Sequence, residues 1–252
     1  MKYTVITGAS SGIGYATALQ FAQKGKSVIL VTRREDKLRT LQEEIKRMYP
    51  TVDAVVRAFD LAQTDKIENF FNDLVSHYEV ETWINNAGFG LFSTVKDQEL
   101  ATISQLVDVN VKAVLLLSTL FVKNYQDTAG TQHLNVSSGA GYNLYPNCVT
   151  YTASKFFVSS FTENLAYELR TQGAKFQAKL VVPEATETEF INVAAGRTDQ
   201  VDYNQLFPKY TTSQEMATNI WQLYESDDVV GQIDDESYDF YHHQGHFPYK
   251  RN

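Results

Sequence analysis

The N-terminal stretch reads Lys2-Tyr-Thr-Val-Ile-Thr7-Gly8-Ala-Ser-Ser-Gly12-Ile-Gly14, and the fold class follows from it. Residues 2–7 are rich in β-branched side chains and typical of a short strand, and a helix with one apolar side follows the glycines. A strand, a glycine-rich turn and a helix in this order form a cradle for a pyrophosphate, because backbone N–H groups and the helix N-terminus point at the anion. Glycine-rich turns also occur for purely steric reasons, so the turn alone leaves both interpretations open.

Strand-like segments alternate with helical patterns along the rest of the chain. This alternation predicts an α/β fold, a Rossmann-like doubly wound parallel sheet of about seven strands with helices on both faces. The 252 residues, 43% of them hydrophobic, fit a single domain spanning 1–252. The strand-like segments lie near residues 3–7, 27–32, 53–59, 82–85, 132–137 and 177–182.

Polar residues follow several of these strands at their carboxyl ends, where a doubly wound sheet binds its ligand. Asn86 and Ser138 occupy such positions, and Ser138 lies thirteen residues before Tyr151, far enough for a loop to fold its hydroxyl back against the phenol. Tyr151 and Lys155 lie one helical turn apart, so the ammonium can lower the pKa of the phenol. Turn-forming asparagines, a strand-terminal serine and a surface Tyr–Lys pair are the alternatives.

Taken together, these residues resemble the short-chain dehydrogenase/reductase family over about Tyr3 to Phe190. The family pattern is Thr-Gly-x-x-x-Gly-x-Gly, then Asn-Asn-Ala-Gly, a helix Asn, a Ser and Tyr-x-x-x-Lys. The resemblance implies a catalytic set, and no position of it is missing. That set is Asn110, Ser138, Tyr151 and Lys155.

The same resemblance implies which residues hold a dinucleotide cofactor. They are Gly8, Ser10, Ser11, Gly12, Ile13, Gly14, Arg33, Arg34, Asp60, Asn86, Ala87, Gly88, Tyr151, Lys155, Pro183 and Thr188. Asp60 would contact the adenine, although capping of a helix N-terminus is the competing explanation.

The end of the second strand bears on the choice of cofactor. An acid there would accept hydrogen bonds from the ribose of NAD, whereas this chain has Thr32-Arg33-Arg34. A guanidinium binds a 2′-phosphate with charge-assisted bonds or stacks on the adenine, so we expect NADP(H), led by Arg33, rather than NAD(H). The alternative is that both arginines simply begin the charged helix around Glu35 to Met48.

The family chemistry is hydride transfer between the nicotinamide and a carbonyl or alcohol substrate. The resemblance implies that Tyr151 exchanges the proton, that Lys155 activates it and holds the nicotinamide ribose, and that Ser138 orients the substrate oxygen. Asn110 would hold a water that links Lys155 to solvent. A carbonyl reductase, an NADP⁺-using alcohol dehydrogenase and a non-catalytic NADP(H)-binding regulatory protein on the same fold are the three hypotheses.

One residue departs from the family pattern. The segment Val182-Pro183-Glu184-Ala185-Thr186-Glu187-Thr188 resembles the family's Pro-Gly-x-x-x-Thr run, with Glu184 in place of the glycine. A side chain here could crowd the nicotinamide, and its carboxylate could stabilise the positively charged oxidised ring. We therefore hypothesise that Glu184 shifts affinity toward NADP⁺ relative to NADPH; a solvent-directed side chain is the alternative.

Aromatic and apolar residues around the expected site suggest a small substrate with a hydrophobic portion. A lid region is expected at about 184–212, and its basic residues, Arg197 and Lys209, would meet either an acidic substrate group or solvent. Tyr203 and Phe207 belong to the same loop. The residues expected to line the pocket are Tyr142, Leu144, Tyr145, Phe89, Phe92 and Phe190.

The net charge of −8 disfavours nucleic acid and anionic membranes as partners. Val114 to Val122, the longest apolar run, is too short to span a bilayer, and the strand that starts at residue 3 leaves no room for a signal peptide. With the lone Cys148, this favours the cytoplasm. The His242-His243-x-x-His246 cluster is expected to bind no metal, because Gly245 and Pro248 oppose a helix. By family analogy, the long helical stretches 97–123 and 152–171 pair subunits in a homodimer or homotetramer.

Overall fold

A computed structural model describes residues 1–196 and 202–249. Its centre is a sheet of eight strands within the described residues, in the order β10-β9-β6-β5-β4-β1-β2-β3. The strands from β3 to β9 in this order run parallel, with Thr7 opposite Val31 and Ile6 opposite Ile84, while β10 is antiparallel to β9. The bounds are β1 Lys2–Thr7, β2 Ser27–Thr32, β3 Ala54–Ala58, β4 Glu79–Asn85, β5 Gln132–Val136, β6 Gln177–Val182, β9 Val230–Ile233 and β10 Phe240–His243.

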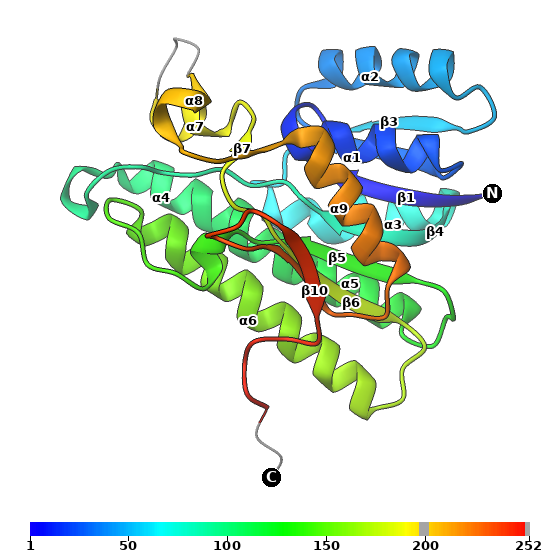
Figure 1. Ribbon diagram of the computed structural model, residues 1–252. Coiled ribbons are helices and arrows are strands. Elements are labelled where there is room, and N and C mark those ends of the chain that lie inside the picture. Colours follow the sequence, from blue (N-terminus) through cyan, green and yellow to red (C-terminus); the bar gives the residue numbers. More distant parts are fainter. Residues whose placement is uncertain (197–201, 250–252) are drawn as a thin grey trace.

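Helices cover both faces of this sheet (Figure 1). Side chains of α1 (Gly12–Gln23), α2 (Glu35–Met48) and α9 (Ser213–Glu225) bury one apolar cluster, which includes Phe21, Leu41 and Trp221. Side chains of α3 (Ile67–His77), α5 (Val114–Tyr125) and α6 (Val149–Thr171) bury the other. Because central parallel strands are buried on both faces, they are almost continuously apolar, as Ser27–Thr32 illustrates.

Short elements connect these layers. They are the 3₁₀ turns Thr64–Lys66, Val95–Asp97 and Gly139–Gly141, the helices α4 (Leu100–Val107), α7 (Phe190–Ala194) and α8 (Tyr203–Leu206), and the two-residue strands β7 (Thr186–Glu187) and β8 (Thr211–Thr212). In Figure 1, α7 and α8 project beyond the sheet.

The predicted doubly wound fold is confirmed, and each of the six expected strand segments coincides with a strand. The sheet has eight strands rather than about seven, since β9 and the antiparallel β10 extend the edge beyond β6. The expected helix 97–123 is interrupted: α4 ends at Val107 and a π-helical stretch, Asp108–Ala113, joins it to α5.

The continuous run Leu100–Tyr125 is long and apolar enough to cross a membrane by length and composition alone. Leu106, Leu117 and Phe121 in this run are buried inside the protein. The core helix of a globular protein has the same composition. Burial accounts for these three residues, whereas Leu100, Val107 and Leu115 of the same run are exposed.

Candidate active site

A crevice of about 960 Å³ lies at the carboxyl ends of the parallel strands. Its walls include the loops that follow β1, β2, β3, β4, β5 and β6, together with the segment after β7 and the turn between β9 and β10. Parallel strands bring all these loops to one edge of the sheet, which is where open α/β sheets bind ligands. Each expected cofactor residue except Gly14 lines this crevice, as do Ser138, Tyr151 and Lys155.

The glycine-rich turn is shaped for close approach. Gly8 and Gly12 have φ angles of 69° and 56°, a region that other residues rarely adopt. A β-carbon on Gly14 would lie 2.4 Å from the Gly8 carbonyl oxygen and from Asn86 Nδ2. Thr7 Oγ1 accepts hydrogen bonds from the N–H groups of Asn86 and Ala87, which ties the turn to the end of β4. Such a cradle at the N-terminus of α1 fits the pyrophosphate of a nicotinamide dinucleotide.

Arg34 is the arginine that contacts the glycine-rich turn. Its Nε and Nη2 donate to Ser10 Oγ at 3.0 and 2.8 Å, and Nη2 also donates to Ser11 Oγ at 2.8 Å. Arg33, expected to lead, is exposed at the crevice wall. Asp60 lines the crevice, and its Oδ1 also accepts a hydrogen bond from Ala62 N, so the carboxylate shapes a turn before the Thr64–Lys66 helix rather than capping it directly.

Tyr151 is almost fully buried near the start of α6, with 6% of its surface exposed. Burial raises the pKa of Tyr151 well above its usual range, and the Ser138 hydroxyl opposes this rise. Nearby Cys148, Glu184 and Tyr145 add to the increase. The expected lowering of this pKa by Lys155 is therefore not found: removal of the phenol from water dominates, and Lys155 is not among the groups that shift the pKa of Tyr151.

Lys155 lies one turn further along α6, and its ammonium is 5.8 Å from the centre of the Tyr151 ring. Its Nζ donates to the carbonyl oxygen of Val136, at the end of β5, at 2.9 Å. Burial lowers the pKa of Lys155 from 10.5 to about 8. Lys155 therefore changes between its charged and neutral forms near pH 8, close to the neutral range in which general acids and bases operate.

Asn110 is buried in the π-helical stretch between α4 and α5. Its Oδ1 accepts from Phe89 N at 3.1 Å, and its Nδ2 donates to Phe89 O at 2.9 Å and to Ser154 Oγ at 3.2 Å. A β-carbon on Gly88 would lie 3.2 Å from Asn110 Oδ1 and 3.6 Å from Lys155 Nζ. Asn110 thus fixes the loop after β4 beside Lys155, a task that its motif did not reveal.

The loop after β6 brings three further expected residues to the crevice. The Pro183 carbonyl accepts from Gly139 N at 2.8 Å, and the Thr188 side chain lies 2.8 Å from where a β-carbon on Gly12 would sit. The Glu184 side chain turns into the crevice rather than into open solvent. Burial raises the pKa of Glu184 from 4.5 to about 7, with a further increase from Asp235.

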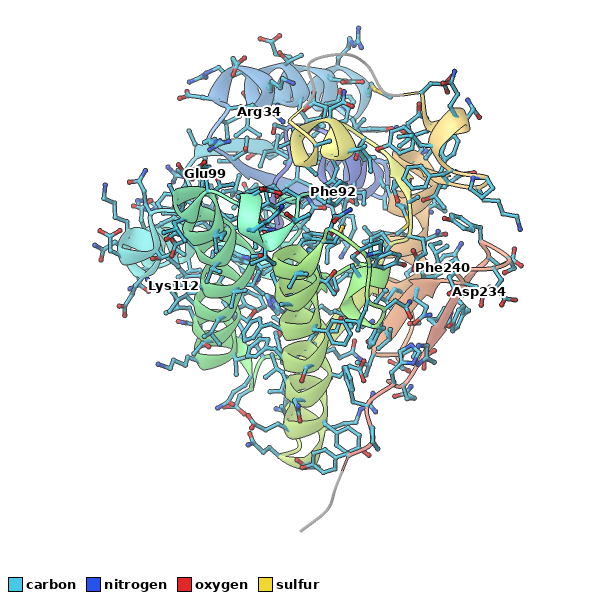
Figure 2. The ribbon with its side chains drawn as sticks, turned by 90° about the vertical axis from the view of Figure 1, so that its left-hand side faces the viewer. Arg34, Phe92, Glu99, Lys112, Asp234 and Phe240 are labelled. Atoms are coloured by element: carbon cyan, nitrogen blue, oxygen red, sulfur yellow. The ribbon has the colours of Figure 1, made fainter. Side chains whose placement is uncertain are left out.

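Aromatic rings surround Tyr151 on the substrate side. The ring centres of Phe190 and Phe92 lie 5.4 and 6.3 Å from that of Tyr151. In Figure 2, Phe92 lies near the middle of the view, below Arg34. Four of the six expected lining residues line the crevice, namely Phe89, Phe92, Phe190 and Tyr145.

The other two lie elsewhere. Leu144 is 84% exposed, and Tyr142 packs against His246 and Phe247 of the C-terminal segment. Its hydroxyl donates to Glu163, which also accepts hydrogen bonds from the N–H groups of His246 and Phe247. Tyr142 therefore anchors the C-terminal segment to α6.

The expected lid region starts and ends beside the crevice. Its two ends are joined by the parallel pair β7–β8, in which Thr186 lies opposite Thr211. Tyr203 is buried and its hydroxyl bonds to the backbone of Thr188, whereas Lys209 donates to the carbonyls of Glu236 and Ser237. The Lys209 charge is thus turned toward the β9–β10 loop. Arg197 lies outside the described residues.

Two different side chains hold the three C-terminal histidines. His242 pairs with Asp228, while the imidazoles of His243 and His246 contact Gln232. Within residues 1–196 and 202–249, no group of three or more His, Cys, Asp or Glu side chains is arranged to hold a metal ion.

Several crevice residues escaped the sequence-based reasoning, among them Glu189, Asp235 and Tyr238. Glu189 follows directly on the Thr that ends the expected cofactor run, so its position was a usable signal. Asp235 and Tyr238 come from the turn between β9 and β10, and no motif marks that turn. Tyr238 adopts a φ of 64°, unusual for a tyrosine.

Comparison with known proteins adds to this geometry. The family model described as short chain dehydrogenase matches residues 2–198. The chain belongs to the short-chain dehydrogenase/reductase family. Among curated proteins it is similar to sulfoacetaldehyde reductase 2 of Chromohalobacter salexigens, with 35% identity over 213 residues, which cover 83% of this chain and 82% of the relative.

Solved structures of the family share the fold. A short-chain dehydrogenase from Sphingobium yanoikuyae in complex with NADPH superposes with a TM-score of 0.84 at 24% identity, covering 94% of this chain and 89% of the other. One from Burkholderia phymatum in complex with NAD gives 0.76 at 23% identity, covering 88% and 84%. The chain therefore shares the Rossmann-like fold of these two structures, one of which contains NADPH and the other NAD. Its family membership makes the protein an oxidoreductase.

Proposed function

We propose that the protein transfers hydride between NADP(H) and a small carbonyl or alcohol substrate, with Ser138, Tyr151, Lys155 and Asn110 as its functional set. The proposal rests on the observation that Ser138 and Lys155 both lie beside Tyr151. Its buried phenol lines the crevice together with Ser138, whose hydroxyl opposes the rise in the pKa of the phenol, and the Lys155 ammonium lies 5.8 Å from its ring centre. A proton donor, an orienting hydroxyl and a cation are what carbonyl reduction requires.

Each residue has a distinct task in the proposed reaction. When bound, the cofactor supplies or accepts the hydride, and its oxidised ring adds a positive charge. In reduction, a C–H bond forms at the carbonyl carbon, the C=O π bond breaks, and the oxygen takes the proton of Tyr151. The Lys155 ammonium stabilises the phenolate left behind, and Ser138 holds the substrate oxygen beside the phenol. Asn110 keeps the Phe89 backbone in place beside them.

NADP(H) rather than NAD(H) is supported by the charges at the adenosine end. Arg34 lies against Ser10 and Ser11, and Arg33 is exposed at the same wall. Two guanidinium groups there favour a dianionic 2′-phosphate.

The crevice favours an uncharged substrate with a hydrophobic portion. Phe89, Phe92 and Phe190 supply apolar surface beside Tyr151, and the carboxyl groups of Glu184 and Asp235 lie in the same crevice. Two acidic groups oppose an anion such as the sulfonate in the name of the 35%-identical relative. Our proposal therefore places this chain's substrate outside the sulfonates.

Subunit assembly and location complete the proposal. Leu100, Val107 and Leu115 are exposed on α4 and α5, which supports a homodimer or homotetramer formed through these helices. Sedimentation velocity tests it, since a monomer would contradict it. We also propose a cytoplasmic location and a substrate lid formed by the described residues within 184–212.

The function is tested with a panel of aldehydes, ketones and alcohols, including a sulfonate aldehyde, followed at the nicotinamide absorbance. We expect turnover of uncharged compounds, and a loss of about 10²- to 10⁴-fold in kcat for Tyr151→Phe with NADPH affinity nearly unchanged. Tyr241→Phe, outside the crevice lining, is the matched control. Tight NADPH binding without any turnover would instead support the non-catalytic alternative, which the comparisons do not favour.

A further inference from the structure

Glu189 bridges Arg34, at the adenosine end of the crevice, and Lys37. Its Oε2 accepts from Arg34 Nη1 at 3.0 Å, and its Oε1 accepts from Lys37 Nζ at 2.9 Å. Hydrogen bonds from these two cations hold the pKa of the Glu189 carboxyl at about 2, so it is ionised at neutral pH. All three side chains are partly exposed, at 38%, 41% and 48%. The bridge is therefore exchangeable rather than a fixed part of the core.

The bridge joins segments far apart in the sequence. Arg34 and Lys37 lie at the start of α2, whereas Glu189 directly precedes α7. The first residue of α7, Phe190, packs against Tyr151 with ring centres 5.4 Å apart. Glu189 thus links the adenosine end of the crevice to a wall of the proposed catalytic end.

A 2′-phosphate needs the same donors that Glu189 uses. Arg34 already donates from Nε and Nη2 to Ser10 and Ser11, which leaves Nη1 as its contact with the carboxylate. A phosphate dianion at this guanidinium would also lie close to the Glu189 anion and repel it. A nucleotide without that phosphate leaves the bridge in place, because ribose hydroxyls are neutral.

We propose that Glu189 is a cofactor-selectivity residue that competes with the 2′-phosphate for Arg34 and Lys37. When the phosphate replaces the Glu189 carboxylate at Arg34 and Lys37, the start of α7 is released from α2. Binding of the phosphate thereby alters a wall of the substrate site. The proposal rests on the NADP(H) preference proposed above.

The first experiment measures affinities of NADP⁺ and NAD⁺ by titration calorimetry for wild type, Glu189→Gln and the matched control Glu187→Gln. Glu187 is also exposed and lies two residues away. We expect Glu189→Gln to bind NADP⁺ about three- to tenfold more tightly, as for the loss of two competing exposed ion pairs, with NAD⁺ unchanged or weaker. The control should match wild type.

Two results would overturn the inference in distinguishable ways. If wild type prefers NADP⁺ but Glu189→Gln and Glu187→Gln give equal affinities, the competition is wrong while the cofactor proposal stands. If wild type binds both nucleotides equally, the cofactor proposal fails and the inference fails with it.

The second experiment tests release of α7 by hydrogen exchange in wild type. Adenosine 2′,5′-bisphosphate carries the critical phosphate but no nicotinamide to cover α7. We expect it to speed amide exchange in Phe190–Ala194 about three- to tenfold, whereas 5′-AMP leaves the rates unchanged. Equal rates with the two ligands would overturn the link between phosphate binding and α7.

Discussion

Glu184 lies directly over the backbone of Gly139. One of its carboxyl oxygens is 1.7 Å from the point that a β-carbon on Gly139 would occupy. Gly139 follows Ser138, so the residue that replaces the family glycine reaches the residue next to the proposed catalytic serine. The Glu184 carboxyl therefore occupies space that is free because Gly139 has no side chain.

We predict that Gly139→Ala will push the Glu184 carboxyl out of its place. The added methyl group overpacks the site and should lower the free energy of unfolding by about 1–3 kcal/mol, as measured by urea denaturation. In the Gly139→Ala/Glu184→Gly double variant the collision is gone, so the loss due to alanine should largely vanish. An equal alanine effect with and without Glu184 would show that the two residues do not interact.

Glu184 should also make stability depend on pH. Its pKa is 4.5 ordinarily and about 7 in the folded protein, so the fold retains this proton and its free energy of unfolding falls as pH rises from about 4.5 to 7. Glu184→Gln should stabilise by about 1–2 kcal/mol at pH 8, allowing for partial exposure, and by little at pH 4.5. Denaturation at both pH values checks this, with Glu187→Gln as control. Lys155 affects stability in a separate pH range. Because its pKa is lowered in the folded protein, the free energy of unfolding rises with pH only between about pH 8 and 10.5.

The Glu184 carboxylate should favour the positively charged oxidised cofactor. We predict that Glu184→Gly weakens NADP⁺ binding about threefold or more relative to NADPH, in line with a partly screened charge pair. Dissociation constants for both forms, measured above pH 8 where Glu184 is ionised, check the ratio. If the ratio of the NADP⁺ and NADPH dissociation constants is the same in wild type and Glu184→Gly, the prediction is wrong.

Asn110 should matter for stability as well as for catalysis. Asn110→Leu leaves the partly buried N–H and C=O of Phe89 without their partners, and we expect a loss of about 1–3 kcal/mol in the free energy of unfolding. Asn124→Leu removes one exposed side-chain bond on α5 and should change stability by under about 0.5 kcal/mol. Urea denaturation of both variants gives the comparison. A near-neutral Asn110→Leu would mean that this clamp contributes little.

The sheet and the crevice could be predicted because backbone rules fix them. The parallel doubly wound arrangement and the position of Gly8, Asn86 and Ser138 at strand ends follow from the alternation of strand and helix patterns. Strands β9 and β10 were harder to foresee, since Val230–Ile233 is a short strand that contains a glycine and is stabilised only by its neighbours.

Side-chain direction was beyond what the sequence could predict. Arg33 and Arg34 are adjacent and chemically equal, yet only Arg34 turns toward Ser10 and Ser11. Tyr142 belongs to an expected pocket segment but bonds to Glu163, because the C-terminal segment, distant in sequence, covers it. Contacts between segments that are distant in sequence determine where these side chains point, and sequence patterns do not reveal such contacts.

The pairing of β7 with β8 has a consequence for how the loop between them can change in length during evolution. Thr186 lies opposite Thr211 and Glu187 opposite Thr212, so the chain leaves and re-enters the body of the protein at one small pair of strands. Closing a longer loop between fixed ends costs only about 0.6 kcal/mol for each doubling of its length. Insertions and deletions between these strands can therefore accumulate during evolution, or be made by design, to suit new substrates while Tyr151 and the glycine-rich turn keep their places.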